Sequence, residues 1–272
     1  MSMPEVTFVL MTCGEKTEKS CLKSIESFQT EIAFKEVRNV CPQIVALNQM
    51  IECVDTEFFV ALDSDMILES DAWSRIRYSI TKHRYDPKWH TILFPLWDTL
   101  FEKKILALKV MRSEIFKKNL FKDTPTPDVE HYQRLTNSDY TCITEFLSQR
   151  PIGKHVVKGH HYCYNKLRDM YQTFRFHNFE WDSNLFMGGT DLLSKSKAHF
   201  DYFLLKWVET NKEDYLSCIA GMFDGLTARL EGSSKTLNNR NYVVENKFAI
   251  GSYLNWYTNQ LVTNRSMEPL NV

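Results

Sequence analysis

The fold is decided by residues 46–65, which read ALNQMIECVDTEFFVALDSD. Residues 57–62 are almost wholly apolar, rich in aromatic and branched side chains, and too short for a helix. A run of this kind is typical of a strand covered on both faces of a sheet. It ends abruptly in Asp63-Ser64-Asp65. The stretch therefore predicts a helix, a buried strand and a polar turn.

The residues before this stretch predict further alternation of strands and helices. Residues 6–12 and 32–37 have the pattern of strands, residues 18–29 have helical spacing, and Pro42 opens a second helix. A β-α-β-α-β order predicts right-handed crossovers, and a mainly parallel sheet binds ligands at the carboxyl ends of its strands. Two loops, residues 12–15 and 63–65, are expected to meet at that edge.

The rest of the chain predicts a completed sheet and then helices. We expect helices at 71–83 and 128–135, strands at 91–95 and 106–112, and a sheet that ends near Tyr164. Residues 167–176, 191–210 and 215–230 read as helices. The prediction is an α/β domain over residues 1–165, with a helical C-terminal region over residues 166–272 packed on it.

The composition of the chain indicates which partners it can bind and in which cellular compartment we expect it. The 272 residues carry a formal net charge of -1, so no basic field favours nucleic acid. The apolar run at residues 6–11 is too short for a signal sequence or a transmembrane segment, and we expect a cytoplasmic protein. Seven cysteines without zinc-ligand spacing favour free thiols.

The two carboxylates that end the third strand predict a metal site. Breaking a sugar–diphosphate bond requires stabilisation of the charge that develops on the diphosphate, which a divalent cation provides as a Lewis acid. Mn²⁺ and Mg²⁺ take oxygen ligands. In an extended segment Asp63 and Asp65 would face the same way while Ser64 points elsewhere. Alternatively, the acidic residues only terminate the strand and cap a turn.

The helix and apolar strand that end in this DxD motif resemble the nucleotide-sugar-binding half of family 2-like GT-A glycosyltransferases. The likeness covers residues 5–70 well and residues 90–165 weakly. It implies a nucleotide-sugar donor of UDP or GDP type, with Asp63 near the ribose or metal and Asp65 on the metal. The donor-binding residues that it implies are Thr12, Cys13, Gly14, Glu15, Arg38, Asn48, Asp63 and Ser64.

A candidate general base follows the proline-rich segment 123–127. Asp128 lies six residues before an Arg-Leu pair, as does the aspartate in the Glu-Asp segment of the resembled family. A carboxylate there could take the proton of the attacking acceptor hydroxyl, which would make the enzyme inverting. Asp128 is equally suited to cap a helix, and Glu130 is the second candidate.

Residues 155–162 supply the candidate third metal ligand. They contain His155, His160 and His161, and on an extended segment only one member of the His-His pair would face the site. We expect His161 to bind the metal and Lys158 to neutralise the diphosphate.

The reaction expected is transfer of a hexosyl sugar to a hydroxyl of a glycan, as in polysaccharide biosynthesis. A retaining mechanism stays open. Other readings are a nucleotidyltransferase of similar topology, a haloacid-dehalogenase-type phosphatase, and an inactive GT-A-like binding module. The aromatic residues of the C-terminal region favour a core, with an acceptor platform or a homodimer face as alternatives; they are Trp181, Phe186, Phe200, Tyr202, Phe203 and Trp207.

Overall fold

The structure, a computed structural model, describes residues 6–124, 127–145, 150–177 and 192–227. Within this part of the chain there are two compact units, which divide between Val157 and Lys158. The first carries a mixed sheet with helices on both faces, and the second is helical. The chain therefore has an α/β fold.

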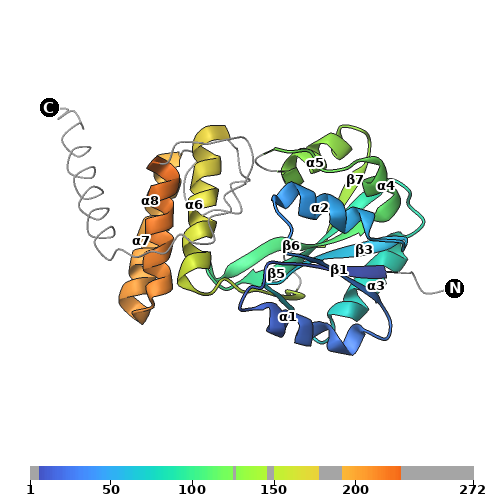
Figure 1. The fold of residues 1–272 in the computed structure, drawn as a ribbon, viewed down its shortest axis with the longest axis horizontal. Helices are drawn as coiled ribbons and strands as arrows, with labels where there is room; N and C mark the ends of the chain where they lie inside the picture. Colours follow the sequence, from blue (N-terminus) through green and yellow to red (C-terminus); the bar gives the residue numbers. More distant parts are fainter. Residues whose placement is uncertain (1–5, 125–126, 146–149, 178–191, 228–272) are drawn as a thin grey trace. The chain divides into compact units, whose positions relative to one another are not determined.

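The first unit begins with the predicted β-α-β-α-β order. A short 3-10 turn at Glu26–Phe28 extends the first helix. β1 pairs in parallel with β2 on one side and with β3 on the other, so the carboxyl ends of all three strands lie at one edge (Figure 1). The elements are β1 (Val6–Thr12), α1 (Glu18–Ile25), β2 (Ala33–Arg38), α2 (Gln43–Glu52) and β3 (Phe58–Asp63).

The sheet continues with strands that follow less regular connections. Its order is β2-β1-β3-β6-β5-β8-β4, with β7 on β5. Among the described residues four of the seven strand pairings are parallel; β6 is antiparallel to its two neighbours because it returns directly from β5. The elements are β4 (Met66–Leu68), α3 (Ala72–His83), β5 (Trp89–Asp98), β6 (Lys103–Arg112), α4 (Ser113–Lys118), α5 (Pro127–Thr136), β7 (Thr141–Thr144) and β8 (Gly153–His155).

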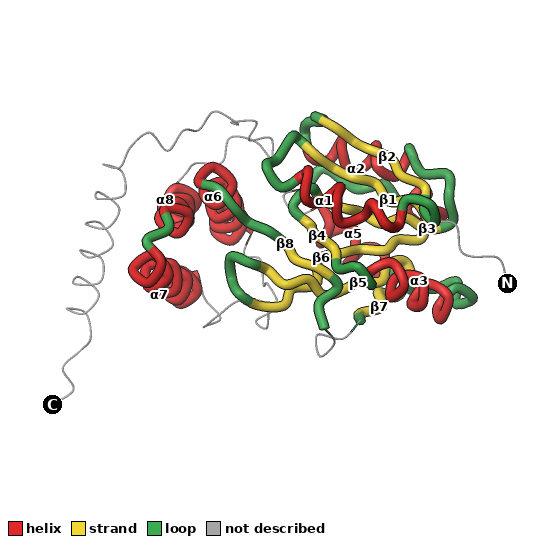
Figure 2. The backbone as a smooth tube through the Cα atoms, turned by 90° about the horizontal axis from the view of Figure 1, so that it is seen from below, coloured by secondary structure: helices red, strands yellow, loops and turns green. Residues whose placement is uncertain are grey.

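Both faces of the sheet are buried, which explains the unbroken apolar sequence of β3. Phe58, Val60 and Leu62 pack with α1 and α3 on one face, whereas Phe59 and Ala61 pack with α2 and α4 on the other. Figure 2 shows α1 and α3 in front of the strands, on one side of the sheet. Alternating side chains thus serve two cores, and only the polar residues at the strand ends remain for chemistry.

The short strand β8 fixes the position of its last residue, His155. It pairs in parallel with β5 and antiparallel with β4, with His155 opposite Asp98 and Met66. Gly153 permits the close approach, since a Cβ there would lie 2.5 Å from the backbone oxygen of Ile67. The prediction of a sheet reaching Tyr164 was wrong, because α6 (His160–His177) begins soon after β8.

The second unit contains α6, α7 (Leu192–Thr210) and α8 (Glu213–Thr227). Helices α6 and α8 approach closely at Gly221, where an added Cβ would lie 2.1 Å from the backbone oxygen of Tyr164. Phe200 and Phe203 are buried, in accord with the core reading, while Trp181 and Phe186 lie outside the described residues. None of the helices in the described ranges has the length and apolar character needed to cross a membrane.

Candidate active site

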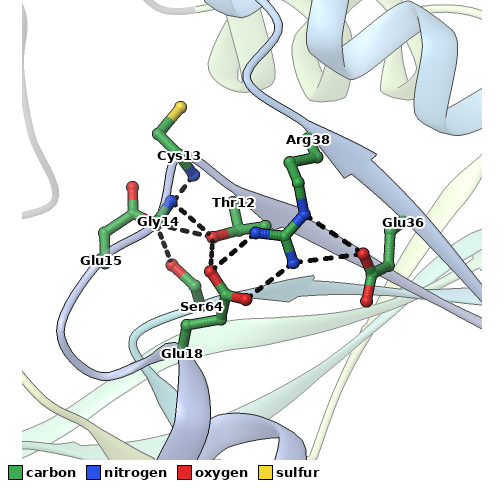
Figure 3. A network of polar contacts seen from close by, with 8 residues as sticks. All are labelled: Thr12, Cys13, Gly14, Glu15, Glu18, Glu36, Arg38 and Ser64. Atoms are coloured by element: carbon green, nitrogen blue, oxygen red, sulfur yellow. Dashed lines mark hydrogen bonds and ion pairs between the residues drawn. The ribbon is translucent and has the colours of Figure 1, made fainter.

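The carboxyl ends of β1, β2 and β3 bring most of the predicted donor-binding residues together. Thr12 lies opposite Arg38 in the parallel register, and Met11 lies opposite Asp63. The loop at residues 12–15 and the turn after Asp63 therefore meet, as the strand order predicted. Figure 3 shows the resulting network of polar contacts.

Glu15 is the acceptor at the centre of this network. Its Oε2 accepts hydrogen bonds from Thr12 Oγ1 at 2.9 Å, Cys13 N at 2.8 Å and Ser64 Oγ at 2.6 Å. Partial burial alone would raise the pKa of Glu15, but these hydrogen bonds outweigh it and the pKa is lowered. Gly14 adopts a φ of 82°, a backbone conformation that side chains rarely tolerate, and this allows the tight loop. The loop therefore presents an ionised carboxylate.

Arg38 is held by two carboxylates at the end of β2. Its Nη2 lies 2.7 Å from Glu18 Oε1 and 3.2 Å from Glu36 Oε2. Its side chain is 41% exposed, so the guanidinium remains accessible from solvent. The edge thus offers a cation and several carboxylates that can form hydrogen bonds to a polar ligand.

The DxD motif forms a turn and not the extended segment that was expected. Asp63 is the last residue of β3, while Ser64 and Asp65 form a turn before β4. The backbone bonds Ser64 N to Met11 O at 3.2 Å and Val156 N to Asp65 O at 2.8 Å hold this turn. The two carboxylates are consequently placed by the turn and by β8, and strand alternation does not align them.

A buried cysteine lies under this turn. Cys21 Sγ is 3.7 Å from the backbone oxygen of Asp63. Burial first, and then the negative charges of Asp65 and Asp63, raise the pKa of the Cys21 thiol to about 12. The thiol is therefore neutral at physiological pH and serves as a packing residue.

Asp65 contacts a histidine that is itself held by a second aspartate. His155 Nε2 lies 3.1 Å from Asp65 Oδ2, and His155 Nδ1 lies 2.7 Å from Asp98 Oδ2. Asp98 Oδ1 also accepts the backbone N–H groups of Leu100 and Phe101, at 2.9 and 2.8 Å. The three side chains are at most 13% exposed. This carboxylate–imidazole–carboxylate arrangement is the most buried polar feature of the candidate site.

Sequence reasoning missed Asp98. The predicted strand ended at Pro95, but β5 continues to Asp98 beyond an irregularity in register between Phe94 and Pro95. The signal that could have found it is a single acidic residue closing an apolar strand, the same pattern that drew attention to Asp63.

The predicted base lies at the start of α5 and contacts a lysine from β6. Lys109 Nζ is 3.3 Å from Asp128 Oδ2 and lies 5.5 Å from the centre of the Tyr132 ring. Burial would lower the pKa of Lys109, but attraction to Tyr132, Asp128 and Asp63 raises it. The lysine is therefore charged and electrostatically linked to Asp128 and Asp63, two of the three predicted functional aspartates.

Two predicted residues are engaged in contacts within the protein. Glu130 pairs with Arg134 at 2.9 Å and Lys122 at 3.5 Å; burial would raise its pKa, but the two cations lower it. Asn48 bonds with its amide to both backbone groups of Phe121, at 3.1 and 2.9 Å. Asn48 thus fastens α2 to the segment before α5.

The remaining predicted residues belong to the second unit. Lys158 is exposed. The side chains of His160 and His161 lie outside the described part of the structure. Their expected extended conformation was wrong, because they are the first two residues of α6.

The donor atoms of the site determine which cations it can hold. The described residues contain no group of three or more His, Cys, Asp or Glu side chains able to hold a metal ion. Asp65 and His155 nevertheless form a pair of oxygen and nitrogen ligands 3.1 Å apart. Adjacent ligands at about 2.1 Å from one octahedral cation are separated by about 3 Å. This pair fits a cation that completes its shell with substrate oxygens and water.

Comparisons with known proteins gave similarity at the level of structure alone. No protein-family model matches the chain, and no curated protein matches it by sequence. A mannosyltransferase, PcManGT from Pyrobaculum calidifontis in complex with GDP-Man and Mn²⁺, aligns with a TM-score of 0.47 and 15% identity, covering 96% of this chain and 85% of that one.

Two further solved structures align with this chain at lower TM-scores. TarS 1-349 from S. aureus aligns with a TM-score of 0.42 and 12% identity, over 84% of this chain and 93% of that one. The bifunctional IspDF from Campylobacter jejuni aligns with a TM-score of 0.37 and 14% identity, over 54% of this chain and 52% of that one. The solved structures similar to this α/β chain thus include a mannosyltransferase with its bound donor and cation.

Proposed function

We propose that this protein is a metal-dependent glycosyltransferase that moves a hexosyl sugar from a nucleoside-diphosphate donor to a hydroxyl of a glycan. The observation that carries the proposal is the pairing of Asp65 with His155 at the carboxyl edge of β3, where their ligand atoms are 3.1 Å apart. In α/β sheets this edge is where ligands bind.

Asp65 and His155 would hold the cation, with Asp63 beside them at the end of β3. Asp98 would keep His155 oriented through its Nδ1 atom. A bound Mn²⁺ or Mg²⁺ would offset the negative charge that develops on the departing diphosphate. His155 takes the role that sequence reasoning gave to His161, because its ring contacts Asp65.

The edge formed by Glu15, Arg38 and Ser64 would bind the nucleoside. The ionised Glu15 can accept hydrogen bonds from ribose hydroxyls or from a base N–H group. Arg38, which is partly exposed, can donate to carbonyl or phosphate oxygens. Lys158 remains a proposed partner of the diphosphate, and the C-terminal region a proposed acceptor surface.

Asp128 would act as the base. Its carboxylate is 45% exposed and can therefore meet an acceptor hydroxyl. It would take the hydroxyl proton as the acceptor oxygen bonds to the anomeric carbon and the bond to the diphosphate breaks. This single displacement inverts the anomeric configuration. Glu130, which is paired with Arg134 and Lys122, is less available for proton transfer.

A thermal-shift experiment tests the proposal. The protein is melted with UDP, GDP, CDP or no nucleotide, each with Mn²⁺ and with EDTA, because a ligand that binds only the native state raises Tm. One nucleoside diphosphate should raise Tm, and only with Mn²⁺. Asp65→Asn should abolish this shift because an amide lacks the charge that holds the cation, while Asp55→Asn, an exposed matched control, should retain it.

Two results would contradict the proposed function. If no nucleoside diphosphate stabilises the wild-type protein in the presence of Mn²⁺, the glycosyltransferase proposal is wrong. Stabilisation by a nucleoside triphosphate, together with release of pyrophosphate on adding a sugar phosphate, would identify a nucleotidyltransferase.

A further inference from the structure

We propose that Lys109 is a positioning residue that holds Asp128 for proton removal. The inference rests on the proposed function, because Asp128 is a base only if the protein transfers a sugar. Lys109 was no part of the predicted site, and it lies 19 residues before its partner, on a different element.

The placement of Lys109 is unusual for a lysine. β6 lies between β3 and β5, and Lys109 is opposite Ala61 on one and Leu93 on the other. Lys109 and Met111, two residues apart on the strand, share a face, and Met111 packs in the core beneath α2 and α4. A lysine in the middle of a sheet loses hydration, so its retention requires compensating partners.

These partners include Asp128, the proposed base. Nζ contacts Asp128 Oδ2 at 3.3 Å, lies over the Tyr132 ring, and is attracted to Asp63. Asp128 and Tyr132 are one turn apart on α5, so Lys109 contacts the helix at two points. A single, partly buried cation therefore holds the first turn of α5 against β6.

This arrangement restricts the rotation of the Asp128 side chain. The ammonium group holds one carboxylate oxygen by a charge-assisted hydrogen bond. In the reaction the acceptor O–H proton would pass to Asp128 as the acceptor oxygen bonds to the anomeric carbon, and the bond from that carbon to the diphosphate would break, with its electron pair leaving on the diphosphate oxygen. Lys109 keeps its own proton throughout and touches neither the sugar nor the acceptor.

A double-mutant cycle separates this role from a structural one. We compare the wild type with Lys109→Met, Lys109→Arg, Asp128→Asn and the Lys109→Met/Asp128→Asn double variant. Lys118→Met serves as a control, since Lys118 forms an exposed pair with Glu114 on α4. The assay is release of nucleoside diphosphate from the nucleotide sugar whose nucleotide stabilises the wild type, with water as acceptor, giving kcat and KM.

If Lys109 acts through Asp128, Lys109→Met lowers kcat about tenfold or more, since a positioned base contributes about 10² to 10⁴. KM and the Mn²⁺-dependent thermal shift stay close to those of the wild type. In the Asp128→Asn background the same substitution changes kcat less than about twofold. Lys109→Arg, which retains the charge, recovers most of the activity, and Lys118→Met has no effect.

Three outcomes would overturn the inference. They are an equal loss of kcat in both backgrounds, a loss of the nucleotide thermal shift in a folded Lys109→Met protein, and no loss at all. If Lys109→Met does not fold, Lys109→Gln is put through the same cycle with the same criteria. Failure of the proposed function looks different, because then the wild type itself shows no nucleotide-dependent shift.

Discussion

Two groups of buried histidines in the sheet unit differ in what their ring nitrogens meet. His155, which is 5% exposed, has a carboxylate oxygen facing each nitrogen. His90 and His131 are fully buried among aromatic rings, and His131 lies 4.4 to 4.5 Å from the ring centres of Phe121 and Phe116. Within the described residues, one nitrogen of each of these two has no hydrogen-bond partner.

The difference shows that burial alone does not define a functional histidine. Burial, together with the mutual repulsion of their charged forms, lowers the pKa of His90 to about 4, and burial lowers that of His131 to about 4 against the opposing hydrogen bond to Asn119. These two are neutral packing residues. His155 instead has the charged surroundings of a ligand or proton-handling group.

Replacing Asp98, one of the two carboxylates beside His155, should have the largest effect, a loss of Mn²⁺ affinity. In Asp98→Asn the backbone N–H groups of Leu100 and Phe101 retain the amide oxygen, so the amide NH₂ faces His155 Nδ1. That favours the tautomer with its hydrogen on Nε2, which cannot bind a cation. We expect Mn²⁺ affinity, measured by electron paramagnetic resonance of the free ion, to fall by about 10- to 100-fold.

The exposed substitution Asp55→Asn is the reference for this measurement and should bind Mn²⁺ as the wild type does. Unchanged affinity in Asp98→Asn would mean that His155 is no ligand, and that the two aspartates only hold β8 in place.

Acidification should have an intermediate effect. It should lower the stability of the protein through protonation of His90 and His131. The pKa of His90 and of His131 falls from an ordinary value of 6.5 to about 4 on folding, so both contribute stability fully above pH 6.5. This contribution is lost as the pH falls from 6.5 toward 4, because the unfolded chain takes up protons first. Denaturant midpoints measured across this range should therefore fall.

His131→Gln tests the assignment, since its amide can keep the hydrogen bond to the backbone oxygen of Asn119 while it does not titrate. The variant should be less stable at neutral pH but should show a shallower loss of stability between pH 6.5 and 4. An unchanged slope would assign the acid sensitivity to other groups.

Breaking an ion pair of Arg38 at the exposed end of β2 should have the smallest effect, a small change in stability. Glu18→Gln removes one of the two carboxylates on Arg38, whose side chain is 41% exposed and keeps Glu36. Surface pairs of this kind contribute about 0 to 1 kcal/mol, so we expect the free energy of unfolding to change by less than about 1 kcal/mol. A larger loss in urea denaturation would show that this network is as structurally important as the pairing around His155.

Local sequence was sufficient for the elements from β1 to β3 and for the edge that these strands form. Apolar runs and helical spacing predicted α1, α2 and the three strands, and residues at the strand ends met because the strands are parallel. The loops at residues 12–15 and 63–65 could be placed at this edge because each follows the end of a predicted strand, whereas Arg38 was implied by the family resemblance.

The arrangement around His155 was beyond such reasoning. Asp65 and Asp98 lie 90 and 57 residues from His155, and they meet only through the pairing of β8 with β4 and β5. Strands of three residues carry almost no periodic signal, and Pro95 argued against a long β5. Lys109 lay within a predicted strand, but its partner comes from α5, and no local pattern joins them.

The contrast between two thiols gives the candidate site a chemical reporter of its own. Cys21, neutral beneath the DxD turn, will resist alkylation at physiological pH. Cys13 is exposed in the loop whose backbone holds Glu15. A reagent that labels accessible thiols therefore modifies Cys13, together with the exposed Cys41 and Cys142, but not the buried Cys21. Binding of a ligand over the loop at residues 12–15 can then be followed as protection of Cys13.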